Sequence, residues 1–128
     1  MRSLSLISVL KALAEETRLR ILNLLMETEL CVCELEDILN INQSNASRHL
    51  NKLSNANLVI YEKRGHYVYY RINREMLTKY PFLNELLGKE LSEIKQCEED
   101  KKKLSLYKNK GITCEQLQKE KLSLYINL

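Results

Sequence analysis

Residues 32–53, VCELEDILNINQSNASRHLNKL, hold two apolar stripes that recur at helical spacing on either side of a short polar stretch. The stripes consist of Val32, Leu35, Ile38 and Leu39, followed by Ala46, Leu50 and Leu53. The residues between them, 40–43, are typical of a turn. Two short helices joined by a tight turn predict a helix-turn-helix whose second helix presents a polar and basic outer face.

A β-hairpin is predicted directly after this pair of helices, because the hydrophobic period changes from about four residues to two. Residues 59–62 and 66–72 alternate as strands, with the basic tip Lys63-Arg64-Gly65 between them. We expect one face to pack on the helices, namely Val68, Tyr70 and Ile72, and the other to carry Tyr67, Tyr69 and Arg71. The predicted fold is therefore mainly α with a β-hairpin wing, a winged helix-turn-helix.

The net charge of +3 is distributed unevenly along the 128 residues. Residues 1–42 carry four Lys and Arg against seven Asp and Glu, whereas residues 43–74 carry six against one. The remaining residues carry ten against nine. Cations gathered in one stretch release phosphate counterions together, so residues 43–74 are predicted to bind nucleic acid.

The positions expected to contact DNA lie on the open face of the second helix and at the hairpin tip. They are Gln43, Ser44, Ser47, Arg48, His49, Asn51 and Lys52 on the helix, and Lys63 and Arg64 at the tip. His49 has an alternative role in packing the helices together, and His66 is expected to be a solvated turn residue. Neither histidine has a Ser or Cys partner at the spacing of a catalytic dyad, so no enzyme is predicted.

Four segments in order resemble the ArsR/SmtB family of metal-responsive winged-helix repressors. They are LKALAEETRLRILNLL (10–25), ELCVCEL (29–35), NQSNASRHLNKLSNANLV (42–59) and RGHYVYYRIN (64–73), and the resemblance covers about residues 7–94. The resemblance implies a homodimer joined through its terminal helices. It also implies that the apo dimer binds double-stranded operator DNA and releases it when a metal or metalloid binds. The ELCVC motif is most similar to the arsenic-sensing members, and also to cadmium- and lead-sensing members.

An apolar stripe after Pro81 independently favours a homodimer. It comprises Leu83, Leu87, Leu91 and Ile94 on a long predicted helix. The alternative is that the stripe packs only on its own domain. We expect residues 1–95 to form the DNA-binding and dimerisation domain and residues 96–128 a helical extension. No apolar run approaches a membrane span, and four unevenly spaced cysteines are typical of a reducing compartment, so a cytoplasmic protein is expected.

Cys31 and Cys33 lie one residue apart just before the recognition helix. Because a regular helix turns about 100° per residue, Cys31 should face the apolar stripe and Cys33 should point outward, about 200° away. One ion could then take both thiolates only if the first helical turn unwound, and that strain would pass to the recognition helix. Soft thiolates select soft ions, so the pair predicts a metal or metalloid site. For Cys31 alone, the alternative is a small core hydrophobe.

A third ligand has to come from elsewhere in the chain. In the arsenic-sensing pattern that this sequence resembles, a further cysteine stands at the position of Glu36. The remaining thiols are Cys97, expected at the end of the dimerisation helix, and Cys114, in a capping box that favours its thiolate. The preferred site is Cys31 and Cys33 with Cys114 or Cys97, from either subunit. Alternatively, Cys97 and Cys114 form a separate site or act as redox thiols.

Three thiolates without histidine favour trivalent arsenic or antimony as the inducer, whereas four favour cadmium, lead or zinc. Residues 75–128 contain no histidine, which argues against the helix zinc site that other family members carry. Two further hypotheses remain. One is a winged-helix regulator whose cysteines sense oxidation, and the other is an interaction module or small enzyme that does not bind DNA.

Overall fold

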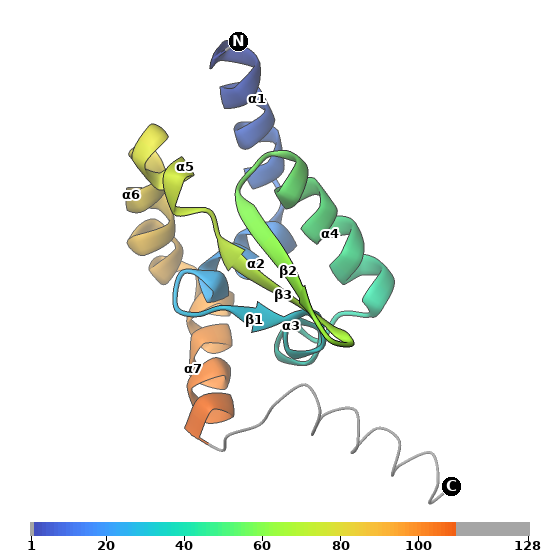
Figure 1. Ribbon diagram of the computed structural model, residues 1–128. Coiled ribbons are helices and arrows are strands. Elements are labelled where there is room, and N and C mark those ends of the chain that lie inside the picture. The colour runs from blue at the N-terminus through green and yellow to red at the C-terminus, as the bar shows by residue number, and fades with distance from the viewer. Residues whose placement is uncertain (1, 110–128) are drawn as a thin grey trace, which may run out of the picture.

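The computed structural model (Figure 1) describes the backbone of residues 2–109 and the side chains of residues 5–109. In chain order its elements are α1 (Arg2–Leu13), α2 (Glu16–Leu25), β1 (Leu30–Cys31), α3 (Val32–Leu39), α4 (Gln43–Asn55), β2 (Val59–Arg64), β3 (Tyr67–Ile72), α5 (Arg74–Lys79), α6 (Phe82–Gly88), the 3-10 helix η1 (Glu90–Glu93) and α7 (Lys95–Asn109). Helices predominate and one hairpin follows α4, which confirms the predicted winged helix-turn-helix. Within the described part, every helix is too short or too polar to cross a lipid bilayer.

The turn of the helix-turn-helix is built by two asparagines. Asn40 ends α3 in the left-handed conformation, with a φ of 55°, which a short polar side chain tolerates better than most. Asn42 then caps α4, because its Oδ1 accepts a hydrogen bond of 2.8 Å from the backbone N–H of Asn45. The recognition helix therefore begins at a fixed residue and direction relative to α3.

The sheet has three antiparallel strands in the order β1-β3-β2, and Gly65 makes the hairpin turn with a φ of 62°. Tyr70 and Ile72 are buried in the main core and Val68 packs against it, as the alternation predicted. The sequence did not predict β1, which has only two residues and pairs Cys31 with Tyr69. This short strand determines where the first cysteine lies.

The segment after Pro81 differs from the long helix that the sequence predicts. It forms α6, then η1, and only then α7, with Gly88 as the last residue of α6. Glycine is a poor helix former, which accounts for a break at this position. Cys97 consequently lies in the first turn of α7 and not at the end of a dimerisation helix, so that expectation was wrong. The stripe residues Leu83, Leu87 and Leu91 are buried in the chain's own core, as the alternative reading held.

Helix α7 packs against α2 and α3 and contributes Cys97, Leu104 and Tyr107 to the main core. Two polar contacts fix it. The Arg20 guanidinium donates to both carboxylate oxygens of Asp100, at 2.7 and 3.0 Å, and the Asn23 amide donates to the carbonyl oxygen of Cys97 at 3.0 Å. The chain as far as residue 109 therefore shares one core, across the boundary expected at residue 95. Cys114 and the rest of the predicted extension lie outside the described residues.

Candidate functional site

The open face of α4 carries the polar side chains that the sequence assigned to DNA contact. Six of the seven helix positions are exposed: Gln43, Ser44, Ser47, Arg48, Asn51 and Lys52. The Arg48 guanidinium donates to the side-chain oxygen of Asn45 at 3.1 Å, which holds it along the helix surface. Ala46, Leu50 and Leu53 are fully buried on the opposite side. This amphipathic division leaves one continuous polar face for a nucleic-acid groove.

His49 is the exception, and the structure corrects its expected role. Its side chain is buried, with only 5% of the residue exposed, and Nδ1 lies 3.3 Å from an Arg18 nitrogen and 3.7 Å from the Glu15 carboxylate. Burial lowers the pKa of His49, although Glu15 opposes this effect. The residue therefore joins α4 to α2 and does not present its imidazole to a base. The 3.6-residue period places position 49 next to Leu50 and Leu53, at the edge of the buried face.

At the hairpin tip, Lys63 and Arg64 are both exposed, as expected, but their surroundings differ. Arg64 makes ion pairs with Glu29 at 2.5 Å and Glu62 at 3.0 Å, and its guanidinium lies 4.7 Å from the centre of the Tyr69 ring. The hydrogen bond to Glu62 raises the pKa of Arg64. Among the described residues, no carboxylate is paired with Lys63. Lys63 is therefore the more available of the two cations for a phosphate.

The cysteine pair has a geometry different from the one that a regular helix would give. Cys31 lies in β1 and is the N-cap residue of α3, with extended backbone angles of φ −79° and ψ 155°, whereas Cys33 lies in the first turn of the helix. The two Sγ atoms are 2.9 Å apart, so they do not diverge by 200°. Because Cys31 is not helical, a single ion can reach both sulfurs without unwinding the helix, so the premise of that coupling hypothesis, two thiols diverging on a regular helix, was wrong.

A side-chain hydrogen bond closes the start of α3 around the cysteine pair. The backbone N–H of Cys31 donates to Glu34 at 2.9 Å, and burial raises the pKa of that carboxyl group although the same hydrogen bond lowers it. The positive end of the α3 dipole lies at the cysteine pair. Both cysteines are nearly buried, at 1% and 8% exposure, beneath Tyr67 and Tyr69 of the hairpin. The expectation that Cys33 points outward was therefore wrong.

A cavity of about 260 Å³ connects the cysteine pair with the exposed polar face of α4. Its lining comes from β1, α3, the first half of α4 and the hairpin. The lining residues are Cys31, Val32, Cys33, Glu36, Gln43, Ser47, His66, Tyr67, Val68 and Tyr70. Two predicted DNA contacts, Gln43 and Ser47, therefore share a cavity wall with both sulfurs. Sequence reasoning missed this cavity, because its residues converge only through the pairing of β1 with β3.

The structure brings Cys31 and Cys33 together but does not bring Cys97 to them. Cys97 is 1% exposed within the main core, and burial raises the pKa of its thiol, which disfavours the metal-binding thiolate. No cluster of three or more Cys, His, Asp or Glu side chains suited to a metal ion occurs among the residues described here. Within one described chain, the pair offers two soft donors and not a complete three-thiolate site. Cys114, the other candidate third ligand, falls outside this range.

These features define the class of the protein: a helix-turn-helix with an exposed polar recognition helix, followed by a basic hairpin, is a winged-helix DNA-binding fold. Residues 9–61 match the family described as bacterial regulatory protein, arsR family. The arsenical resistance operon repressor of Escherichia coli (strain K12) is 38% identical over 96 residues, 74% of this chain and 76% of that protein. The chain belongs to the arsR family of bacterial regulatory proteins, and not to a family of enzymes.

Other relatives match over shorter stretches. An arsenic resistance transcriptional regulator of Pseudomonas putida is 44% identical over 53% of this chain, and the match spans 54% of the regulator's length. A cadmium resistance regulatory protein homologue of Staphylococcus aureus is 38% identical over 60% of this chain and 67% of its own. A solved homodimeric winged helix-turn-helix domain from Mycobacterium bovis is 29% identical and has a TM-score of 0.58, covering 69% of this chain and 82% of that domain.

Proposed function

We propose that this protein is a metalloid-responsive repressor. It binds operator DNA through α4 and the hairpin as a homodimer, and it releases the DNA when trivalent arsenic or antimony binds Cys31 and Cys33. The observation that carries the proposal is the cavity that Cys31 and Cys33 share with Gln43 and Ser47. The names of the relatives, which are arsenic and cadmium resistance regulators, support an inducer of this class.

The chemistry at the pair is ligand exchange. Arsenous acid loses two hydroxyl groups as two As–S bonds form, and each thiol proton leaves with a hydroxyl as water. The third arsenic position keeps its hydroxyl or takes another thiolate, for which we propose Cys114. A metalloid bonded to these sulfurs enters a cavity that Gln43 and Ser47 also line, so occupancy alters the start of the recognition helix directly. Cadmium, lead or zinc remains the alternative inducer, with oxidation of the thiols as a second alternative.

A homodimer is part of the proposal. Large apolar side chains remain exposed on terminal elements: Ile7 and Leu10 on α1, Phe82 on α6, and Ile94 after η1. A contiguous exposed apolar patch is typical of an interface between copies, and we propose that these side chains contribute to one. Two recognition helices would then read half-sites about 34 Å apart, one turn of the duplex. The homodimeric state of the Mycobacterium bovis domain supports this arrangement.

The test is a DNA-release titration followed by fluorescence anisotropy on a labelled duplex taken from upstream of the gene. Arsenite, antimonite, cadmium, lead, zinc and peroxide are added separately to wild type and to the Cys31→Ser, Cys33→Ser and Cys114→Ser variants. We expect arsenite and antimonite to release wild type, and both Cys31→Ser and Cys33→Ser to lose the response. Cys97→Ser is the matched control and should respond as wild type does. A Cys33→Ser variant that responds normally to every ion would refute the sensing site, and release by peroxide alone would favour the redox alternative.

A further inference from the structure

A groove of about 250 Å³ lies at the far end of the recognition helix from the cysteine pair. It is lined by Ser8, Lys11 and Ala12 of α1, Arg18 of α2, and Lys52 and Asn55 of α4. Figure 1 shows the C-terminal half of α4 beside α1, with the hairpin tip near the other end of α4. Three of the six lining residues are cationic and none is acidic, so the groove is complementary to an anion.

Arg18 is the most informative residue of this groove. It is only 8% exposed, yet within residues 5–109 no ion pair joins its guanidinium to a carboxylate. Its nitrogens instead contact the carbonyl oxygens of Ala12 at 2.6 Å and Lys11 at 3.3 Å, and His49 Nδ1 at 3.3 Å. The first two contacts satisfy carbonyls in the last turn of α1, so Arg18 offsets the negative end of that helix dipole. The Arg18 guanidinium therefore contributes positive charge to the groove wall, with the Glu15 carboxylate, which accepts from the Arg18 backbone N–H at 2.9 Å, close behind it.

The position of this protein groove relative to α4 is compatible with a phosphate of the DNA backbone. Eight residues separate Ser44, at the start of α4, from Lys52, which at 1.5 Å per residue is about 12 Å along the helix axis. The major groove of B-DNA is also about 12 Å wide. A recognition helix that crosses the major groove from one phosphate strand, with its first turn near that strand, would bring Lys52 near the opposite strand.

We propose that the groove formed by Lys11, Arg18 and Lys52 is a phosphate-binding site for the DNA strand on the far side of the major groove. This inference rests on the proposed DNA-binding function and adds α1 to the contact surface. Lys11 and Lys52 are exposed and can reach a phosphodiester oxygen, while Arg18 supplies fixed positive charge behind them. Ser8 and Asn55 add neutral hydrogen-bonding groups at the rim.

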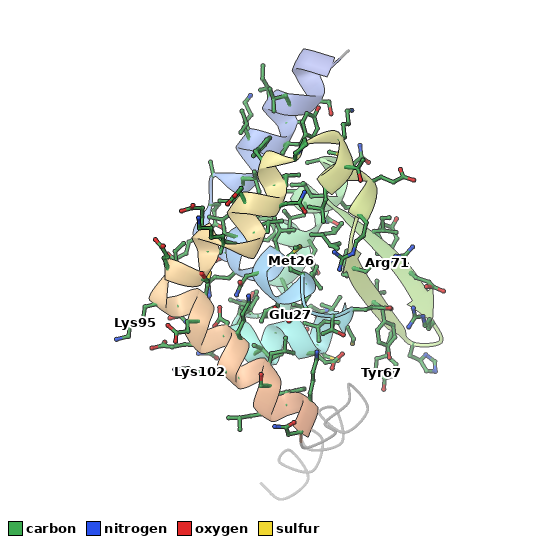
Figure 2. All side chains as sticks on the ribbon, turned by 90° about the vertical axis from the view of Figure 1, so that its left-hand side faces the viewer. Met26, Glu27, Tyr67, Arg71, Lys95 and Lys102 are labelled. Atoms are coloured by element: carbon green, nitrogen blue, oxygen red, sulfur yellow. The ribbon has the colours of Figure 1, made fainter. Side chains whose placement is uncertain are left out.

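Phosphate contacts do not depend on sequence, so a labelled random-sequence duplex is a sufficient probe. Affinity is measured against salt concentration for wild type, Lys11→Gln and Lys52→Gln. The matched control is Lys95→Gln, because Figure 2 shows Lys95 on α7, on the opposite side of the molecule from the hairpin residues Tyr67 and Arg71. Both groove lysines are exposed, so folding of the variants should be unaffected and is checked by circular dichroism.

Each lost phosphate contact should lower the slope of log affinity against log salt by about 0.9 per protomer. The ratio of wild-type to Lys11→Gln affinity for DNA should therefore be roughly 3.5-fold smaller per protomer at about 200 mM salt than at about 50 mM salt. If Lys11→Gln and Lys95→Gln have the same slope as wild type, the groove is not a DNA contact, although the proposed function stands. If wild type itself shows no salt-dependent binding, the proposed function fails. If inorganic phosphate binds at these lysines at millimolar concentration while DNA affinity and its salt slope are the same in Lys11→Gln, Lys52→Gln and wild type, the groove is a free-anion site and the DNA contact is overturned.

Discussion

The buried ion pair between Arg20 and Asp100 helps to hold α7 on the folded core, and Asp100→Asn tests its contribution. Asp100 is only 2% exposed and accepts two hydrogen bonds from Arg20, at 2.7 and 3.0 Å, and one from Gln96 at 3.0 Å. Removing one partner of a buried pair typically costs about 3 to 5 kcal/mol. The Arg20 side chain is 16% exposed, so water can partly solvate the cation that remains. We therefore expect a loss of about 2 kcal/mol in the free energy of unfolding.

Urea unfolding followed by circular dichroism measures this loss at one fixed protein concentration, because dimerisation would make stability depend on concentration. With a slope of about 2 kcal/mol per molar urea, the midpoint should fall by roughly 1 M. The control is Glu98→Gln on the same helix, whose exposed pair with Lys102 should contribute about 0.5 kcal/mol or less. A double-mutant cycle with Arg20→Gln isolates the interaction. A coupling energy indistinguishable from zero would refute the docking of α7 through this pair.

Three further predictions concern the recognition helix and the hairpin. Because burial lowers the pKa of His49, the unfolded chain binds more protons at low pH, so the free energy of unfolding should fall as the pH drops below about 6.5. Urea unfolding at several pH values should show this dependence in wild type and less of it in His49→Gln; equal dependence would contradict it. Asn42→Ala removes the N-cap acceptor of α4 and should cost about 1 kcal/mol in urea unfolding. Gly65→Ala should cost about 1 kcal/mol in the same assay, because its φ of 62° strains an L side chain although no atom would contact the added Cβ; an unchanged midpoint would argue against this turn.

The sequence allowed prediction of the elements that depend on local periodicity. The helix pair and the hairpin follow from the change of apolar period near Leu58, and the structure confirms both. The helix-capping residues also indicated where the helices end and begin. Asn40 at the end of α3 and Asn42 at the start of α4 are of a residue type that is common at these positions. Helix continuity after Pro81 was not predictable from the stripe alone, since the buried leucines keep their spacing while Gly88 interrupts the backbone.

The parts of the site that sequence reasoning missed all depend on contacts between distant residues. The cysteine geometry follows from a two-residue strand whose partner, Tyr69, lies 38 positions further along the chain. His49 is buried because Arg18, 31 residues earlier, contacts its imidazole. The expected directions of residues 31 and 49 were derived from isolated regular helices. Such a projection includes neither the pairing of Cys31 with Tyr69 nor the contact between Arg18 and His49. The local sequence pattern thus predicts which residues share a face of a helix or strand, whereas packing against neighbouring elements determines which residues contact that face.

The relation between the cysteine pair and α4 limits how a metalloid could act. Since Cys31 and Cys33 already face each other, binding an ion across them need not strain the helix, so the proposed coupling does not depend on strain in α3. The energy has to come from what the bound ion and its remaining ligands do in the cavity that Gln43 and Ser47 line. Coupling of this kind is typically about 1 to 3 kcal/mol, and it is reciprocal: DNA must weaken metalloid binding by the same factor that the metalloid weakens DNA binding. A substitution at Ser47 should therefore change the coupling factor, measured as the ratio of DNA affinities with and without metalloid, whereas a release mechanism that acts only on the dimer would leave that ratio unchanged.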